Sequence, residues 1–229
     1  GQTLVIAYDD TPTRTLAVNA YSYPFIRGGL LDAALPYLTY LTPFTYGINA
    51  DGTLLPLADE WLLAAAGQYR TAALMHLSTL TEEGRFDSAR STLILEDADA
   101  QDALVQSILE TVQARHYFGL DVDFEYVLPE QREAYAAFIT RLREALNPFG
   151  CPVIVALAPK TSAAQRGLLY EAHDYALLGA AANAVFLMTY DCGYTYGPPM
   201  AVAPLTPVRA VLDYARTAVA PEKIFMGIP

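Results

Sequence analysis

The sequence of 229 residues is 53% hydrophobic and 17% charged, which is enough apolar material for one large folded domain. Its net charge of −11 disfavours nucleic acid as a partner, because an acidic surface repels phosphate backbones. No apolar run reaches the roughly 18 residues that a transmembrane helix needs, so no membrane span is predicted. No signal peptide is visible, and Gly1 indicates a fragment or a processed chain.

Short strand-like runs alternate along the chain with longer helix-like runs. The predicted strands are residues 16–23, 40–48, 71–77, 119–127, 153–158, 184–189 and 223–228. The predicted helices are residues 28–38, 57–68, 97–115, 129–146 and 205–219. Repeated βα units predict a parallel sheet, and this many strands favour an α/β fold of the TIM type, a (β/α)8 barrel. No glycine-rich phosphate loop follows the first strand, which argues against a dinucleotide-binding sheet.

Three acids occupy alternate positions of the predicted strand 119–127, namely Asp121, Asp123 and Glu125. Successive side chains of a strand point to opposite faces, so the three carboxylates share one face and apolar residues take the other. In a barrel the apolar face packs on helices, which leaves the acids in the interior. There, burial and like charge raise carboxyl pKa values, as a general acid requires. Glu125 lies nearest the C-terminal mouth of the barrel and is the predicted proton donor.

Two other interpretations of these acids are open. Acids at alternate positions also occur on a solvated edge strand. An Asp-x-Asp pair can bind a divalent metal, which would fit a metal-dependent phosphoesterase. The cysteines and histidines lack metal-ligand spacing, so we predict no metal and two free thiols, at Cys151 and Cys192.

The segment FGLDVDFE, residues 118–125, resembles the DGxDxDxE signature of glycoside hydrolase family 18, with Phe118 in place of the leading Asp. The segment LMTYD, residues 187–191, is similar to the Met-x-Tyr-Asp motif on that family's sixth strand. The family's third-strand SxGG pattern is absent. Three further segments resemble the YaaH-type spore-germination and cortex-lytic branch: ALAPKTS (156–162), LYEAHDY (169–175) and GYTYGPPMAVAPL (193–205).

The first residues carry a separate resemblance. GQTLVI, residues 1–6, is similar to the closing strand of a LysM module, which binds N-acetylglucosamine-containing polymers. We therefore expect residues 1–9 to be the tail of such a module and residues 10–229 to form a C-terminally truncated barrel domain.

The family resemblance implies a retaining, substrate-assisted mechanism without metal or organic cofactor. It implies that Glu125 donates the proton and that Asp123 hydrogen-bonds the N–H of the substrate acetamido group. It also implies that Asp121 tunes Asp123 through a shared proton and that Tyr190 binds the acetamido carbonyl oxygen. Asp191, Met188 and Tyr21 are the implied substrate-binding residues. The implied substrate is an N-acetylglucosamine-containing glycan, namely peptidoglycan of the spore cortex, which would place the protein in the spore or cell envelope.

The run 223–228 is the seventh predicted strand, and an eighth is not found before Pro229. An open barrel exposes strand edges, so self-association through that edge is expected as one way to cover it. Two alternative functions stay open: a catalytically silent glycan-binding barrel and a chitinase-like enzyme acting on chitooligosaccharides.

Overall fold

The computed structural model of the protein describes residues 15–81, 83–193 and 197–229. Its central feature is a parallel sheet of seven strands in the order β1-β2-β5-β6-β7-β8-β9, with a small antiparallel hairpin, β3–β4, beside it. The strands are β1 (Asn19–Ser22), β2 (Tyr40–Pro43), β3 (Gly47–Ile48), β4 (Leu54–Leu55), β5 (Ala72–Ser78), β6 (Gly119–Asp123), β7 (Val153–Leu157), β8 (Ala184–Leu187) and β9 (Ile224–Met226). The predicted parallel sheet is confirmed.

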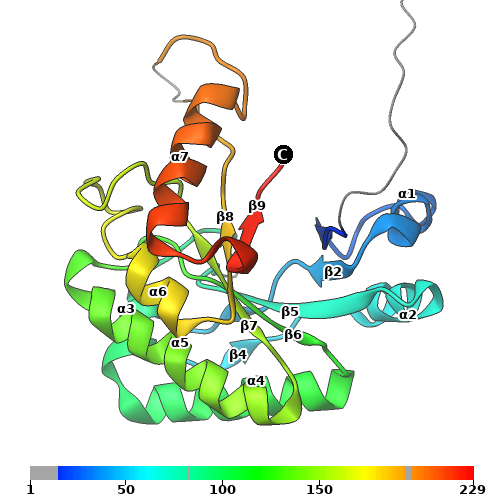
Figure 1. The fold of residues 1–229 in the computed structure, drawn as a ribbon. Helices are drawn as coiled ribbons and strands as arrows, with labels where there is room; N and C mark the ends of the chain where they lie inside the picture. Colours follow the sequence, from blue (N-terminus) through cyan, green and yellow to red (C-terminus); the bar gives the residue numbers. More distant parts are fainter. Residues whose placement is uncertain (1–14, 82, 194–196) are drawn as a thin grey trace, which may run out of the picture.

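Helices connect the strands and lie outside the curl of the sheet (Figure 1). They are α1 (Gly28–Ala34), α2 (Glu60–Tyr69), α3 (Ser88–Glu96), α4 (Ala98–Arg115), α5 (Arg132–Leu146), α6 (Tyr175–Ala181) and α7 (Leu205–Ala218). Four 3-10 turns accompany them: η1 (Leu35–Tyr37), η2 (Pro129–Gln131), η3 (Asn147–Phe149) and η4 (Pro221–Lys223). All five predicted helices are present.

Several predicted bounds were wrong. The strand predicted at 119–127 ends at Asp123, and the strand predicted at 40–48 divides into β2 and β3. Helices α3 and α6 and strand β4 were not predicted. Helices α3 and α6 are short, with nine and seven residues, so neither can show an apolar stripe repeated over several turns.

Helix boundaries follow from local chemistry. The side chain of Asp97 accepts hydrogen bonds from the backbone N–H groups of Asp99 and Ala100, both at 3.0 Å, and so caps α4. Asp174 caps α6 in the same way. The far end of α4 turns at His116, whose φ of 57° lies in the left-handed region.

The main hydrophobic core lies between the sheet and the helices. Helix α5 contributes a stripe that was predicted from its spacing and is fully buried: Tyr135, Phe138, Ile139 and Leu142. A second, smaller cluster packs α1 and α2 against β2: Leu31, Leu35, Leu41, Leu62 and Ala66. Cys151 is buried and Cys192 is half-exposed, and both are free thiols, as predicted.

The sheet curls until its far strands contact each other through side chains. Tyr21 on β1 lies 5.4 Å from Phe186 on β8, measured between ring centroids, and Tyr40 on β2 lies 6.3 Å from Phe225 on β9. Strands β1 (dark blue) and β9 (red) are nevertheless the two outer strands and do not pair (Figure 1). This arrangement is an incomplete (β/α)8 barrel, as predicted.

Residues 1–9, the predicted LysM tail, lie outside the described residues. Within the described ranges, no helix is both long and apolar enough to cross a membrane.

Candidate active site

The predicted column of acids begins on β6. Asp121 and Asp123 are buried on its inner side, with 1% and 6% of their surface exposed. On the outer side the ring of Phe124 stacks on Tyr135 of α5, at 5.7 Å between centroids and an interplanar angle of 3°. The apolar face of the strand therefore packs on a helix, as the alternation predicted.

Glu125 lies two residues beyond the end of β6 and is half-buried. The chain then turns at Tyr126, whose φ of 56° places a non-glycine residue in the left-handed region. The strand thus stops before its last predicted acid. Glu125 lies on the connection that leaves the C-terminal end of the strand, where barrel active sites are built.

Asp121 is joined to β1. The Tyr21 hydroxyl donates a hydrogen bond of 2.5 Å to Asp121 Oδ2. Burial raises the pKa of Asp121 to about 7, although the Tyr21 hydrogen bond acts in the opposite direction. Burial and the neighbouring Asp121 also hold the pKa of the Tyr21 phenol well above its ordinary value, so Tyr21 remains the donor.

Asp123 and Glu125 both favour the protonated state. Burial, with the nearby charges of Glu125 and Asp121, raises the pKa of Asp123 well above its ordinary range. Burial and then the charge of Asp191 raise the pKa of Glu125 to about 7. One oxygen of each buried acid, Asp121 Oδ1 and Asp123 Oδ1, has no hydrogen-bond partner in the described part of the chain. Such groups are costly in an interior, which is typical of a functional site.

A cavity of about 210 Å³ opens beside Asp123. Tyr21, Met188 and Tyr190, all predicted to bind substrate, line it together with Asp123. The structure therefore brings side chains from β1, β6 and the end of β8 to one space. The other lining residues are Ser22, Tyr23, Phe44, His76, Ala156 and Phe186.

The predicted site residues Asp121, Glu125 and Asp191 are not among those that line the cavity. Asp191 is exposed and follows the end of β8, with a φ of 53°. Burial, followed by the charges of Asp123 and Asp121, raises the pKa of Tyr190 above its ordinary value, so its hydroxyl stays protonated. A protonated phenol next to the acids can donate a hydrogen bond to a bound group.

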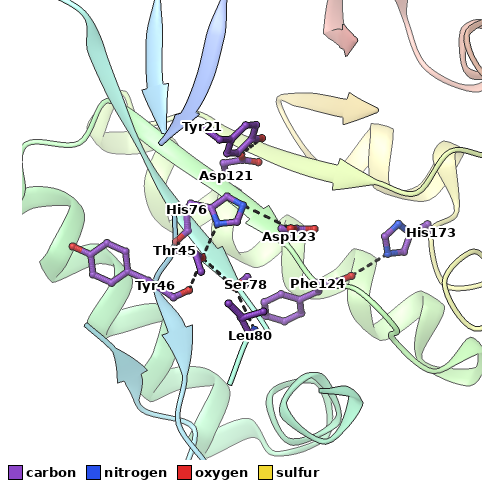
Figure 2. Close-up of polar contacts among 10 residues, drawn as sticks. All are labelled: Tyr21, Thr45, Tyr46, His76, Ser78, Leu80, Asp121, Asp123, Phe124 and His173. Atoms are coloured by element: carbon purple, nitrogen blue, oxygen red, sulfur yellow. Dashed lines mark hydrogen bonds and ion pairs between the residues drawn. The ribbon is translucent and has the colours of Figure 1, made fainter. Parts of the chain in front are cut away.

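The sequence pattern did not identify His76 as a site residue. It lies on β5 directly opposite Asp121 in the sheet register and lines the cavity. Its Nδ1 is 2.6 Å from Thr45 Oγ1, and its Nε2 is 3.8 Å from Asp123 Oδ2 (Figure 2). Burial lowers the pKa of His76 to about 3, so the imidazole is neutral. The sequence did contain a pattern that could have identified it: His76 and Ser78 occupy alternate positions of β5, as the acids do on β6.

Groups of three or more His, Cys, Asp or Glu side chains placed to hold a metal ion do not occur among the described residues. Asp123, the phenols of Tyr21 and Tyr190 and the neutral imidazole of His76 line one cavity. Together they are equipped to bind polar groups and to transfer protons.

The chain matches the family of Glycosyl hydrolases family 18 over residues 76–229, which is more than half of its length. It belongs to this family, and the expectation from its two sequence motifs is confirmed. The sequence is 38% identical to the "Cortical fragment-lytic enzyme" of Bacillus subtilis (strain 168) over 226 residues, covering 94% of this chain and 51% of that protein.

Solved structures of other proteins show the same fold. The spore cortex-lytic enzyme SleL of Bacillus cereus superposes with a TM-score of 0.88 at 37% identity, over 94% of this chain and 51% of that one. A chitinase from Chromobacterium violaceum shares the fold, with a TM-score of 0.84 at 24% identity, over 93% of this chain and 68% of that one. The chain spans about half the length of the curated relatives it matches.

Proposed function

We propose that this protein is a glycosidase that cleaves N-acetylglucosamine-containing glycan, with peptidoglycan of the spore cortex as its substrate. The observation that carries the proposal is the set of acids on and after β6, with pKa values raised by burial, beside a cavity lined by Asp123, Tyr21 and Tyr190. Relatives named as cortex-lytic enzymes support the choice of substrate and a location at the spore envelope.

In the proposed mechanism the substrate supplies its own nucleophile. Glu125 is protonated below its pKa of about 7 and gives that proton to the leaving glycosidic oxygen. The acetamido carbonyl of the substrate attacks the anomeric carbon, and Glu125 then activates water for the second step. Two inversions at one carbon give overall retention, which departs from the usual scheme of two protein carboxylates.

The neighbouring groups act on the acetamido group. Asp123 accepts a hydrogen bond from its N–H, and Tyr190 donates one to its carbonyl oxygen. Asp121 holds Asp123 in the required protonation state, while Met188 and Asp191 contact the cleaved sugar. The unpartnered oxygen Asp123 Oδ1 supports this arrangement, because a buried carboxyl oxygen without a hydrogen-bond partner is costly.

Digestion of purified cortex peptidoglycan tests the role of Glu125. Wild type and Glu125→Gln are compared by release of muropeptides, with Glu130→Gln as the control because Glu130 is exposed beyond the site. We expect Glu125→Gln to lose at least about 100-fold in rate, since it cannot donate the proton, and Glu130→Gln to keep its rate. Equal release by all three proteins would overturn the assignment.

The same assay separates the alternatives. A silent glycan-binding barrel binds the polymer and releases nothing, whereas a chitinase-like enzyme releases products from chitooligosaccharides and leaves cortex intact. A metal-dependent phosphoesterase loses its activity in chelator, and the proposed glycosidase keeps it. An oxazoline-mimicking inhibitor tests the substrate-assisted step. Its affinity is expected to fall in Asp123→Asn and in Tyr190→Phe, and unchanged affinity in both would exclude that step.

We also propose self-association through the open edge of the sheet. Leu16, Met226 and Ile228, in or beside the outer strands, are 67%, 45% and 76% exposed. A strand from a second copy would cover this edge, as would further polypeptide in relatives of twice the length. Sedimentation equilibrium distinguishes the two sources, because a strictly monomeric 229-residue chain rules out self-association.

A further inference from the structure

Two segments, one at the end of β7 and one just before α6, place buried polar side chains behind the connection that carries Glu125. They are residues 156–162 and 169–175, and each contributes a titratable side chain that the proposed mechanism does not use. Lys160 is 2% exposed and His173 is fully buried. Charged and imidazole groups are costly to bury unless their hydrogen bonds are satisfied, so their contacts indicate what they do.

The hydrogen bonds of His173 determine its tautomer. Nδ1 accepts from the backbone N–H of Ala158 at 2.8 Å, so Nδ1 carries no proton. Nε2 lies 3.0 Å from the carbonyl oxygen of Phe124 and therefore carries the hydrogen and donates it (Figure 2). Burial lowers the pKa of His173 to about 4, which keeps the ring neutral and this tautomer in place.

Three more hydrogen bonds hold the imidazole where it is. The Tyr175 hydroxyl donates to the carbonyl oxygen of Ala158 at 2.7 Å and accepts from the backbone N–H of Lys160 at 2.9 Å. The Lys160 ammonium donates to the carbonyl oxygen of His173 at 3.1 Å. The end of β7, the His173 backbone and the His173 ring are thus tied into one buried unit, which we name the His173 clamp (Ala158, Lys160, His173 and Tyr175).

The His173 ring contacts the chain just beyond the last residue of β6 that pairs with a neighbouring strand. The register of β6 ends at Asp123 on the β5 side and at Val122 on the β7 side. Phe124 lies beyond both ends, and its carbonyl belongs to the peptide that leads directly into Glu125. His173 supplies the hydrogen bond that a neighbouring strand supplies farther back, while α5 fixes the Phe124 ring by stacking.

We propose that His173 is a positioning residue for Glu125, acting through its hydrogen bond to the Phe124 carbonyl. This inference rests on the proposed function of Glu125. The side chains of Lys160 and Tyr175 serve to fix the imidazole of His173. Loss of the anchor would let the peptide after Asp123 relax and the Glu125 carboxyl reach solvent. A shift of this kind far from the reacting atoms is known to cost a large factor in rate.

Two substitutions in the full chain separate the two ring nitrogens. In His173→Asn the amide oxygen can replace Nδ1 as acceptor for Ala158, but the side chain is too short to reach Phe124. In His173→Gln the amide nitrogen can reach the Phe124 carbonyl in place of Nε2. The pair therefore removes or keeps the hydrogen bond to Phe124 while both variants lose the imidazole.

The first readout does not need turnover. The Glu125 carboxyl carbon is followed by NMR titration in wild type and both variants. Its pKa is raised mainly by burial, and the other ionisable groups that face it are Asp191, Asp123 and Tyr190, none of which is altered. We expect the Glu125 pKa to fall by about one unit or more in His173→Asn and to stay near the wild-type value in His173→Gln.

The second readout is the rate on cortex peptidoglycan. We expect kcat to fall about 10- to 100-fold in His173→Asn with little change in KM, and His173→Gln to recover most of it. A merely structural role predicts instead that both variants lose stability together and keep the wild-type pKa and kcat per folded molecule. That result overturns the proposal.

If His173→Asn does not fold, Tyr175→Phe decides, because it loosens the clamp and keeps the ring volume. A lowered Glu125 pKa in that variant supports the proposal, and an unchanged value overturns it. Failure of the proposed function is distinguishable, because Glu125→Gln would then be as active as wild type. If Glu125→Gln is inactive and His173→Asn matches wild type, only the positioning role is lost.

Discussion

The hydroxyl of Tyr21 donates a 2.5 Å hydrogen bond to Asp121 across the interior of the barrel, joining two residues that are 100 positions apart in the chain. Tyr21 belongs to an outer strand of the sheet and Asp121 to its middle strand. A group on a distant strand therefore lowers the pKa of Asp121, against the larger opposing effect of burial.

Replacing Tyr21 by Phe is expected to lower the free energy of unfolding by about 1–3 kcal/mol, because a buried carboxyl loses its donor. The pKa of Asp121 should rise above about 7, since the Tyr21 hydrogen bond lowers it in the wild type. Urea denaturation and NMR titration of Asp121 measure the two effects. Tyr69→Phe, on the exposed side of α2, is the control and should change neither quantity. A Tyr21→Phe protein as stable as wild type would contradict the assigned bond.

Replacing Asp191 by Asn is expected to shift the pH dependence of activity. The charge of Asp191 raises the pKa of Glu125, so its removal lowers that pKa from about 7. Glu125 is then protonated over a narrower pH range. The alkaline limb of the pH–rate profile therefore moves to lower pH by about half a unit to one unit. Asn suits the left-handed φ of 53° at this position, so the fold should be kept. If the alkaline limb stays at the wild-type pH, the charge of Asp191 does not raise the pKa of Glu125.

Replacing Asp121 by Asn is expected to make stability less dependent on pH. An unfolded Asp has a pKa near 3.9, and burial raises it to about 7 in the folded protein. Between about pH 4 and 7 the folded state binds more protons than the unfolded state, so this group makes wild type less stable as pH rises. The stability of Asp121→Asn relative to wild type should therefore increase through that range and level off above it. Denaturation at several pH values measures this, and a constant difference would refute a raised pKa.

Replacing Gly119 by Ala is expected to destabilise the start of β6. A Cβ atom there would lie 2.6 Å from the carbonyl oxygen of Pro152, a backbone atom that cannot move aside cheaply. We expect a loss of about 1–3 kcal/mol, as for other overpacked interior sites. Gly28→Ala is the matched control, because nothing lies within 4 Å of its added Cβ. Equal thermal midpoints for the two variants would exclude the close approach.

Much of the site could be predicted because it depends on local periodicity. The alternation of Asp121 and Asp123 with apolar residues identified both the strand and its two faces, and the helix spacing of Tyr135 and Phe138 identified the cover on the outer face. Family motifs pointed to Met188 and Tyr190, which do line the cavity.

Other parts of the site depend on contacts that no local pattern contains. The Tyr21 bond to Asp121 requires the curl of the whole sheet, and the contact of His173 with Phe124 joins residues 49 positions apart. Away from the site, no sequence pattern singled out Asp59, although it is fully buried and accepts hydrogen bonds from Tyr46, Tyr117 and Arg115. The end of β6 was misplaced for the same reason, because strand length is set by how far its neighbours extend.

Among the described strands, β1 shares its backbone pairing with β2 alone, through four residue pairs. Outer strands open more readily than central ones, and each opening would carry Tyr21 away from Asp121. Whatever polypeptide docks along the free side of β1 would slow that opening and keep the phenol on the carboxyl. Closing the barrel at β1 would thereby affect the pKa of Asp121 on β6, although two strands lie between β1 and β6. The Tyr21 hydroxyl is the group that links the two.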